Sequence, residues 1–135
     1  MSTMNMDGDG RLAEQPPAPR PDGSPSAAIS RAIVQLMARY SGRGPTKARA
    51  TVAADHVAVV LEEALTPAER SLVNAGERDL VRRQREALQH LMRDEAATAV
   101  EVATGRRVRL VLCDIEPEEG VALQFFLLDP PADDA

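Results

Sequence analysis

The sequence predicts an α+β domain: a four-stranded, mainly antiparallel sheet with a short N-terminal helix and a long central helix on one face. Helical spacing of apolar residues gives way to alternation twice along the chain, in the order helix, hairpin, helix, hairpin. A length of 135 residues, 44% of them hydrophobic, suits one domain with a modest core. We expect that domain over residues 24–129, between a disordered Pro/Gly-rich tail at 1–23 and a short acidic tail at 130–135.

The first predicted helix begins at Ser24 and Pro25, where a capping side chain precedes proline at the first helical position. Apolar residues then recur at helical spacing and share one face: Ile29, Ile33, Leu36, Met37 and Tyr40. Gly42 ends this helix, because glycine readily adopts the left-handed conformation of a C-terminal cap.

The first predicted hairpin starts at Lys47, where the hydrophobic period changes from helical to alternating. Polar Lys47, Arg49 and Thr51 alternate with the apolar residues Ala48, Ala50, Val52 and Ala54. The dipeptide "DH" separates this run from "VAVVLEEAL" at 57–65. Two strands joined by a short turn are therefore expected.

The central helix begins within "LTPAER", where Thr66 and Glu69 have capping-box spacing and Pro67 occupies the first helical position. The tripeptide "NAG" at 74–76 either breaks or bends the helix. Beyond it we expect one long helix that ends near Gly105. Its apolar stripe is expected to contain Leu80, Val81, Gln84, Leu88, Leu91, Met92, Ala99, Val102 and Ala103.

The last hairpin consists of "RRVRLVLCD" and "GVALQFFLL", joined by the turn "IEPEEG" with Pro117 and Gly120. The central residues of both strands are apolar on both faces, and Cys113 is expected in the core. Because the helices cover only one face of the sheet, the other face needs a cover. We expect a second copy of the chain there, and hence a homodimer.

Composition excludes several classes of function. No apolar run approaches the roughly 18 residues of a membrane span, and the N-terminus lacks the order of a signal peptide. We therefore expect a cytoplasmic location without direct membrane insertion. Equal numbers of acidic and basic residues between positions 24 and 128 give no support to nucleic-acid binding. The single cysteine excludes an internal disulfide and a cysteine-based zinc cage.

The loop "GRGPTK" is the candidate ligand site, and it contains the chain's only lysine. Open backbone N–H groups and two cations suit a phosphate or carboxylate, with Gly42, Arg43, Gly44, Thr46 and Lys47 as the binding residues. The segment leaves a helix and enters a strand, which is the reverse of a Walker loop. A purely geometric interpretation, a glycine cap and a proline-stiffened connection, stays open and leaves Lys47 unexplained.

Other polar clusters have two interpretations each. The first cluster is either a hard-cation site or a solvated turn: Asp114, Glu116, Glu118 and Glu119. A stripe of Arg78, Arg82 and Arg85, with Arg93 further along, either meets an anionic partner or forms a solvated helix face. His56 and His90 are expected to be solvated, and no nucleophilic pair is evident. We therefore expect no enzyme activity, no metal and no cofactor.

These landmarks resemble the MpsC-type domain. The similarity covers roughly residues 26–128, and it depends on "GRGP", "LTPAE", "TGR" and "LCDIEPEEGVALQFFLL" taken together. The family is named for a component of a sodium-linked, membrane-potential-generating system. The resemblance implies association with a membrane system that transports ions or bicarbonate, and a place at the membrane periphery held through a partner. It supplies no catalytic residues.

Three functions are in view. The first is a non-enzymatic, homodimeric interaction or regulatory module beside membrane transport subunits. The alternative is a sensor of small anions or nucleotides that uses the "GRGPTK" loop. KH-like RNA binding comes third, because the element order is loosely similar but a GxxG clamp between helices is absent.

Overall fold

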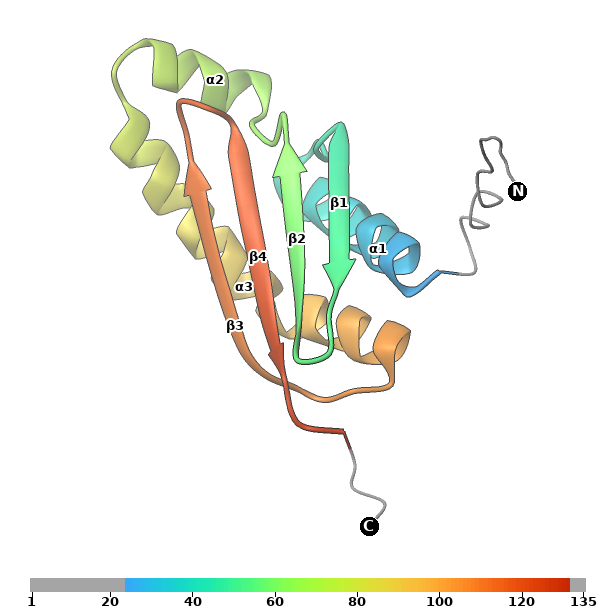
Figure 1. Ribbon diagram of the computed structural model, residues 1–135. Helices are drawn as coiled ribbons and strands as arrows, with labels where there is room; N and C mark the ends of the chain where they lie inside the picture. The colour runs from blue at the N-terminus through green and yellow to red at the C-terminus, as the bar shows by residue number, and fades with distance from the viewer. Residues whose placement is uncertain (1–23, 132–135) are drawn as a thin grey trace, which may run out of the picture.

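The computed structural model describes residues 24–131 (Figure 1). The elements are α1 (Pro25–Ser41), β1 (Lys47–Val52), β2 (His56–Glu62), α2 (Pro67–Asn74), α3 (Arg78–Thr104), β3 (Val108–Glu116) and β4 (Val121–Leu128). The predicted α+β class is confirmed. The expected disordered tail at 1–23 lies outside the described residues, and so do residues 132–135 of the expected acidic tail.

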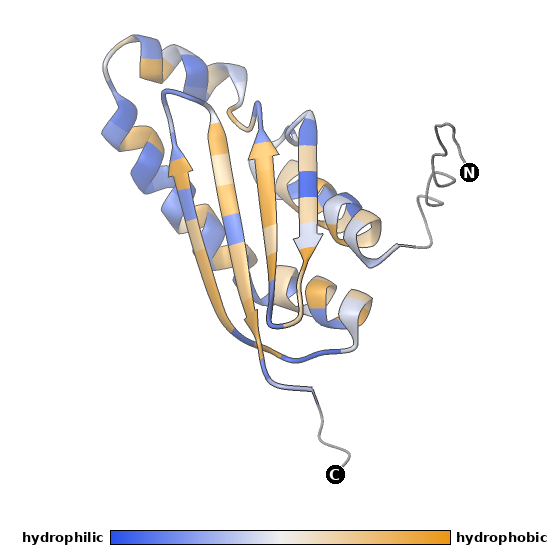
Figure 2. Ribbon diagram, viewed as in Figure 1, coloured by the Kyte–Doolittle hydropathy of each residue, from blue (hydrophilic) through white to orange (hydrophobic). Residues whose placement is uncertain are grey.

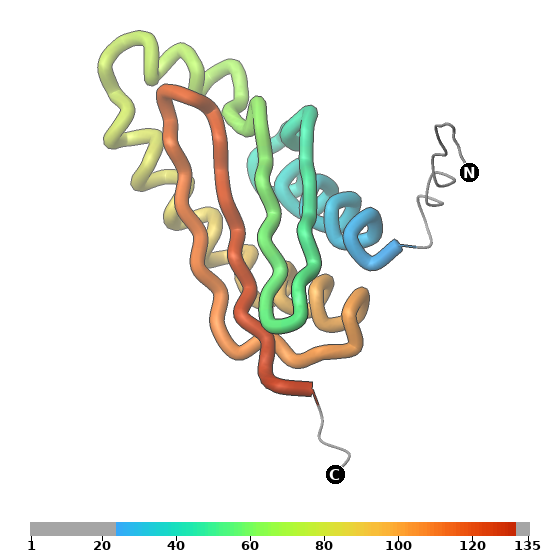
Figure 3. The backbone as a smooth tube through the Cα atoms, viewed as in Figure 1, coloured from blue at the N-terminus to red at the C-terminus, as the bar shows by residue number. Residues whose placement is uncertain are grey.

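The sheet has the strand order β1-β2-β4-β3, and all three neighbouring pairs are antiparallel. Each hairpin pairs within itself, and the long connection through α2 and α3 brings β4 beside β2, with Val59 opposite Gln124. The two hairpins therefore lie side by side with β1 and β3 at the edges, as the backbone trace shows (Figure 3).

Helix α1 forms as its flanking residues predict. The Ser24 side chain accepts a hydrogen bond from the Ala27 N–H, and Pro25 is the first helical residue. At the other end Gly42 has a φ of 89°, and its N–H donates to the Ala38 carbonyl. All four buried residues of α1 belong to the predicted apolar face.

The predicted central helix is two helices. The capping box of Thr66 and Glu69 starts α2 as expected, but α2 ends at Asn74. Gly76 then adopts a φ of 88°, which an α-helix cannot contain, so the chain turns before α3 begins at Arg78. Gly105 caps α3 in the left-handed conformation, close to the predicted end.

The apolar stripe predicted for α3 was partly wrong. The buried residues are Val81, Arg85, Met92, Ala96 and Val100, with Leu88 and Ala103 half-buried beside them. Leu80, Leu91 and Val102 are exposed. With Leu88 and Ala103 included, the buried face runs through residues 81, 85, 88, 92, 96, 100 and 103 in steps of three or four. An apolar residue one position away from this series points about 100° around the helix, toward solvent.

The core lies between the sheet and the helical layer. Helices α1 and α3 pack against each other on one side of the sheet, behind the strands in Figure 1. Val57, Val59 and Leu61 of β2 face them, and so do Ala122, Gln124, Phe126 and Leu128 of β4. No described helix in residues 24–131 is long and apolar enough to cross a membrane.

Candidate functional site

Backbone geometry and close packing explain why the "GRGPTK" loop contains two glycines. Gly42 needs its left-handed conformation to end α1. At Gly44 a Cβ atom would lie 2.9 Å from the Val34 carbonyl oxygen, closer than real Cβ atoms come to backbone. Pro45 is buried. The loop therefore packs tightly against α1, which the geometric interpretation predicts.

Two polar side chains of this loop bond to the β2–α2 connection. The Arg43 guanidinium donates to the Leu65 carbonyl at 2.8 Å and to the Glu63 carbonyl at 3.3 Å. The Thr46 hydroxyl donates to the Glu63 carboxylate. Glu63 itself has a φ of 54°, so these contacts hold a strained turn.

Lys47 is separate from the other loop residues. A shallow pocket of about 270 Å³ is lined by Arg43 and Arg70 together with Glu63, Leu65, Thr66 and Pro67. Lys47 is not among its lining residues, and its side chain is exposed on β1. The structure thus brings Arg43 together with Arg70 rather than with Lys47. Anion binding by the loop stays a prediction.

A buried ion pair that the sequence interpretation missed joins α2 to α3. Arg85 and Glu69 have side chains only 1% and 3% exposed, and two guanidinium nitrogens contact the two carboxylate oxygens at 2.8 Å each. Arg85 also donates to the Ala64 carbonyl, and Glu69 accepts from the Thr66 N–H at 2.8 Å. This bidentate geometry fixes the angle between the two helices.

The charge of Glu69 is stabilised despite its burial. Desolvation alone would raise the pKa of this carboxyl, but hydrogen bonds from Arg85 and from the Thr66 N–H outweigh it and lower the pKa. Glu69 is therefore ionised at neutral pH. The signal for Arg85 was present in the sequence, since position 85 continues the buried spacing from Val81 toward Met92.

The other arginines of the predicted stripe face acids on β3. Arg82 contacts Asp114 at 2.7 Å, and Arg78 contacts Glu116 at 3.1 Å. The pKa of Asp114 is lowered by the Ile115 N–H and then by Arg82, and that of Glu116 by Arg78. The stripe is therefore neither a plain solvated face nor a row of unmatched cations. Within residues 24–131 no three acids, histidines or cysteines gather as a metal site.

No helix of residues 24–131 covers the face of the sheet that points away from α1 and α3, and Figure 2 draws β2, β3 and β4 largely in the hydrophobic colour. We call this side of the sheet the open face, and the registers of the three strand pairs place its side chains in rows. One row runs Arg49, Val60, Leu123, Asp114 and the next runs Thr51, Ala58, Phe125, Leu112. Leu110, Leu112 and Leu123 are exposed, with Leu112 at 56%.

Comparison with known protein families identifies the domain. The family described as "Na+-translocating membrane potential-generating system (MpsC)" matches residues 22–130, which is most of the chain. The chain belongs to the MpsC family. Comparisons with curated proteins and with solved structures found no match. Family membership supports a role related to the membrane-potential system.

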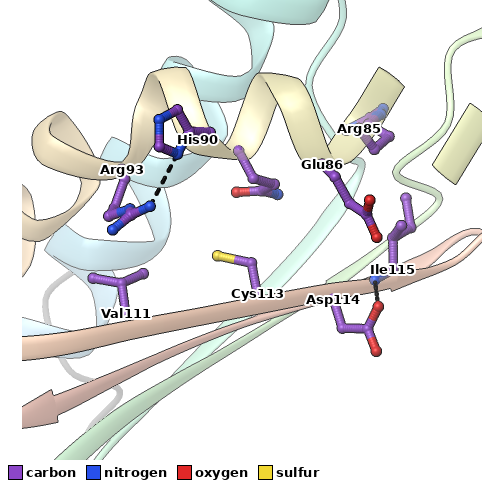
Figure 4. A pocket seen from close by; sticks show the side chains of 9 residues that line it. Arg85, Glu86, His90, Arg93, Val111, Cys113, Asp114 and Ile115 are labelled. Carbon is purple, nitrogen blue, oxygen red and sulfur yellow. Dashed lines mark hydrogen bonds between the residues drawn. The ribbon is translucent and has the colours of Figure 1, made fainter. Parts of the chain in front are cut away.

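In the MpsC domain a groove of about 180 Å³ lies between α3 and β3, with Arg93, His90 and Cys113 at its walls (Figure 4). Cys113 was expected in the core, but β3 is an edge strand and the residue is exposed. Desolvation raises the pKa of its thiol to about 11, so the thiol is protonated at neutral pH and is a weak nucleophile.

Both histidines of the domain have polar neighbours. His90 Nδ1 lies 2.9 Å from an Arg93 nitrogen. His56 Nδ1 lies 2.8 Å from the Asp55 carboxylate, and its ring stacks on Phe125 with centroids 5.2 Å apart. His56 therefore belongs to one end of the open face instead of being fully solvated.

Proposed function

We propose that this MpsC-family chain is a non-enzymatic interaction module, located at the membrane periphery through its partners in a Na⁺-translocating, membrane-potential-generating system. Its family supports the setting. The observation that carries the proposal is the open face, where leucines of β3 and β4 are exposed side by side. Contiguous apolar surface with charged residues at its rim is the usual mark of a protein-binding site.

The internal pairing of the polar groups supports binding over catalysis. Arg85 is matched with Glu69, Arg82 with Asp114, and Arg78 with Glu116. Groups that are committed to structural ion pairs are poorly placed to exchange protons with a substrate. By contrast, a partner that covers the exposed leucines of the open face removes apolar surface from water, which favours association.

The proposal is tested by measuring the membrane potential with an intact and an altered open face. Vesicles that contain the membrane subunits of the system receive the wild-type chain, Leu112→Glu or no chain, and a voltage-sensitive dye reports the Na⁺-dependent potential. Leu91→Glu is the matched control, because Leu91 is 63% exposed on α3, away from the sheet.

We expect Leu112→Glu to lower the potential to the level without the chain, and Leu91→Glu to leave it unchanged. A buried carboxylate opposes any partner at the open face, whereas the same change on α3 meets only water. An equal potential with and without the chain would contradict the proposal. So would a wild-type potential with Leu112→Glu, provided that its circular dichroism spectrum shows a folded protein.

A further inference from the structure

The open face carries opposite charges at its two edges. On the β1 edge stand Lys47 and Arg49, and on the β3 edge stand Asp114 and Glu116. Arg49 and Asp114 terminate the same row, with Val60 and Leu123 between them. Their side chains are 67% and 73% exposed, so both remain accessible although each has a partner within its own chain.

We propose that the occupant of the open face is a second copy of the chain, related by a twofold axis that runs parallel to the strands between β2 and β4. This inference rests on the proposed function and names its partner. The rotation places β1 over β3 of the other copy and leaves the height along the strands unchanged. Each row of one copy then packs against the same row of the other copy, which runs in the opposite direction across the sheet.

The reversed rows are complementary in charge. Arg49 of one copy lies over Asp114 of the other, and Lys47 lies over Glu116, and the symmetry repeats each pair. Lys47 lies opposite Glu62 in the β1–β2 ladder but forms no ion pair within residues 24–131, so Glu116 of the other copy would give the only lysine a second acidic neighbour. Rim pairs of this kind select orientation more than they add affinity.

The reversed rows also complement each other in size. Ala58 and Phe125 are neighbours in one row, so the rotation places the small side chain of each copy under the ring of the other. Val60 meets Leu123 in the next row. Alternation of large and small residues across facing positions lets two sheets pack about 10 Å apart.

The other in-plane twofold axis, perpendicular to the strands, is unfavourable. It would place β1 over β1 and β3 over β3 in opposite directions. Asp114 and Glu116 would then face the partner's Leu110 and Leu112, without a cation opposite them. The two carboxylates would keep only Arg82 and Arg78 of their own chain as cationic partners, and leucine would replace part of the water around them at a cost in free energy.

The footprint suits a dimer of moderate affinity. Four strands about 4.8 Å apart and about seven residues long, at about 3.3 Å each, span a flat area of about 450 Å². Side-chain relief enlarges the accessible area toward the roughly 600 Å² per partner at the lower end of specific interfaces. We therefore expect a micromolar dissociation constant.

A complementation experiment tests both the dimer and its geometry. Sedimentation velocity up to about 100 µM measures self-association of the wild type, Arg49→Asp, Asp114→Lys and an equimolar mixture of the two variants. In the proposed dimer each single variant faces itself with two repulsive contacts. In the mixed dimer the two substituted positions face each other with their charges exchanged, and the unsubstituted Arg49 and Asp114 form the wild-type pair.

We expect each variant alone to raise the dissociation constant at least about tenfold, or about 1.4 kcal/mol, and the mixture to return within about threefold of the wild type. Arg109→Asp, at the irregularity between Val108 and Leu110 and outside the rows, is the charge control and should associate like the wild type. Circular dichroism melts confirm that every variant is folded.

Two results would overturn the inference. The first is a monomeric wild type at about 100 µM. If the Leu112→Glu effect on the membrane potential persisted in that case, a membrane subunit would occupy the open face and the proposed function would stand. The second is a mixture that associates no better than either variant alone. A dimer that had no influence on the membrane potential would instead refute the proposed function and leave the inference intact.

Discussion

Neutralising Glu69 should be among the most damaging single changes in this domain. Glutamine at position 69 can still accept the Thr66 N–H and so preserves the capping box. What it removes is the negative charge beside Arg85, whose side chain is 1% exposed. Glu69→Gln therefore isolates the electrostatic part of the pair from the local helix cap.

The expected loss follows from burial. Removing one partner of a buried ion pair costs about 3 to 5 kcal/mol, because the remaining charge is left without compensation. We expect about 3 kcal/mol here, since the Ala64 carbonyl continues to accept from Arg85. For a domain of this size that corresponds to a fall in melting temperature of about 10 to 20 °C.

Urea denaturation followed by far-UV circular dichroism, at one fixed protein concentration, measures the free energy of unfolding. The series contains Glu69→Gln, Arg85→Met and the double variant. The double variant leaves no buried charge unpaired, so it should be at least about 1 kcal/mol more stable than the sum of the single effects predicts. Glu95→Gln, which alters an exposed pair with Arg39, should lower the stability far less than Glu69→Gln does. A loss below about 1 kcal/mol for Glu69→Gln, or single effects that simply add, would refute this reasoning.

Three further predictions concern pH, packing and the loop. The folded-state pKa of Glu69 is lowered, so the stabilisation by its charge is fully present above the unfolded pKa of about 4.3 and is lost as the pH falls through the folded pKa. The difference in unfolding free energy between wild type and Glu69→Gln should therefore be constant from pH 6 to 8 and shrink below about pH 4.3. A difference that did not depend on pH would contradict this. Gly44→Ala should lower the free energy of unfolding by about 1 to 3 kcal/mol, because its Cβ meets the Val34 carbonyl, and a variant as stable as the wild type would show that the loop yields freely. If the loop binds phosphate or a nucleotide through Lys47, Lys47→Ala should raise the dissociation constant measured by calorimetry roughly tenfold to a hundredfold, with little change in melting temperature. Equal affinities, or no binding in either protein, would show that the loop is not an anion site.

Short sequence motifs predicted the ends of the helices well. Ser24 with Pro25, Thr66 with Glu69, and Gly105 act within one helical turn, so their neighbours in sequence are sufficient to recognise them. The two hairpins are similarly local. The neighbour of β2 was not predictable, because the pairing of Val59 with Gln124 joins residues separated by two helices and carries no short-range signature.

The predictions for Cys113 and Arg85 failed because both depend on how whole elements are arranged, which short-range sequence signals do not determine. Cys113 looked like a core residue because its strand is apolar on both faces, yet β3 lies at the edge of the sheet, where side chains stay accessible. Arg85 looked like a surface residue because arginine usually is one. Its burial depends on Glu69 of the preceding helix, and the break at Gly76 brings that carboxylate within reach.

The candidate loop was predicted as one cluster because its residues are adjacent in sequence. Entry into a strand separates them, since successive side chains of a strand point to opposite faces. Arg43 precedes the strand and turns back to the carbonyls of Glu63 and Leu65, whereas Lys47 begins β1 on the open face. Proximity in sequence therefore overstated proximity in space.

The charges that flank the open face also bear on how two sheets can meet. Joining β1 edges would bring Lys47 and Arg49 of both copies onto one face of the extended sheet, and joining β3 edges would do the same with Asp114 and Glu116. Charged side chains on edge strands are a known defence against such pairing. The irregularity between Val108 and Leu110 further disturbs the β3 edge. Like charges thus oppose edge-to-edge association at both the β1 and the β3 edge. In face-to-face association the same residues meet residues of opposite charge. The arrangement that leaves the sheet edges protected is also the one that covers its apolar face.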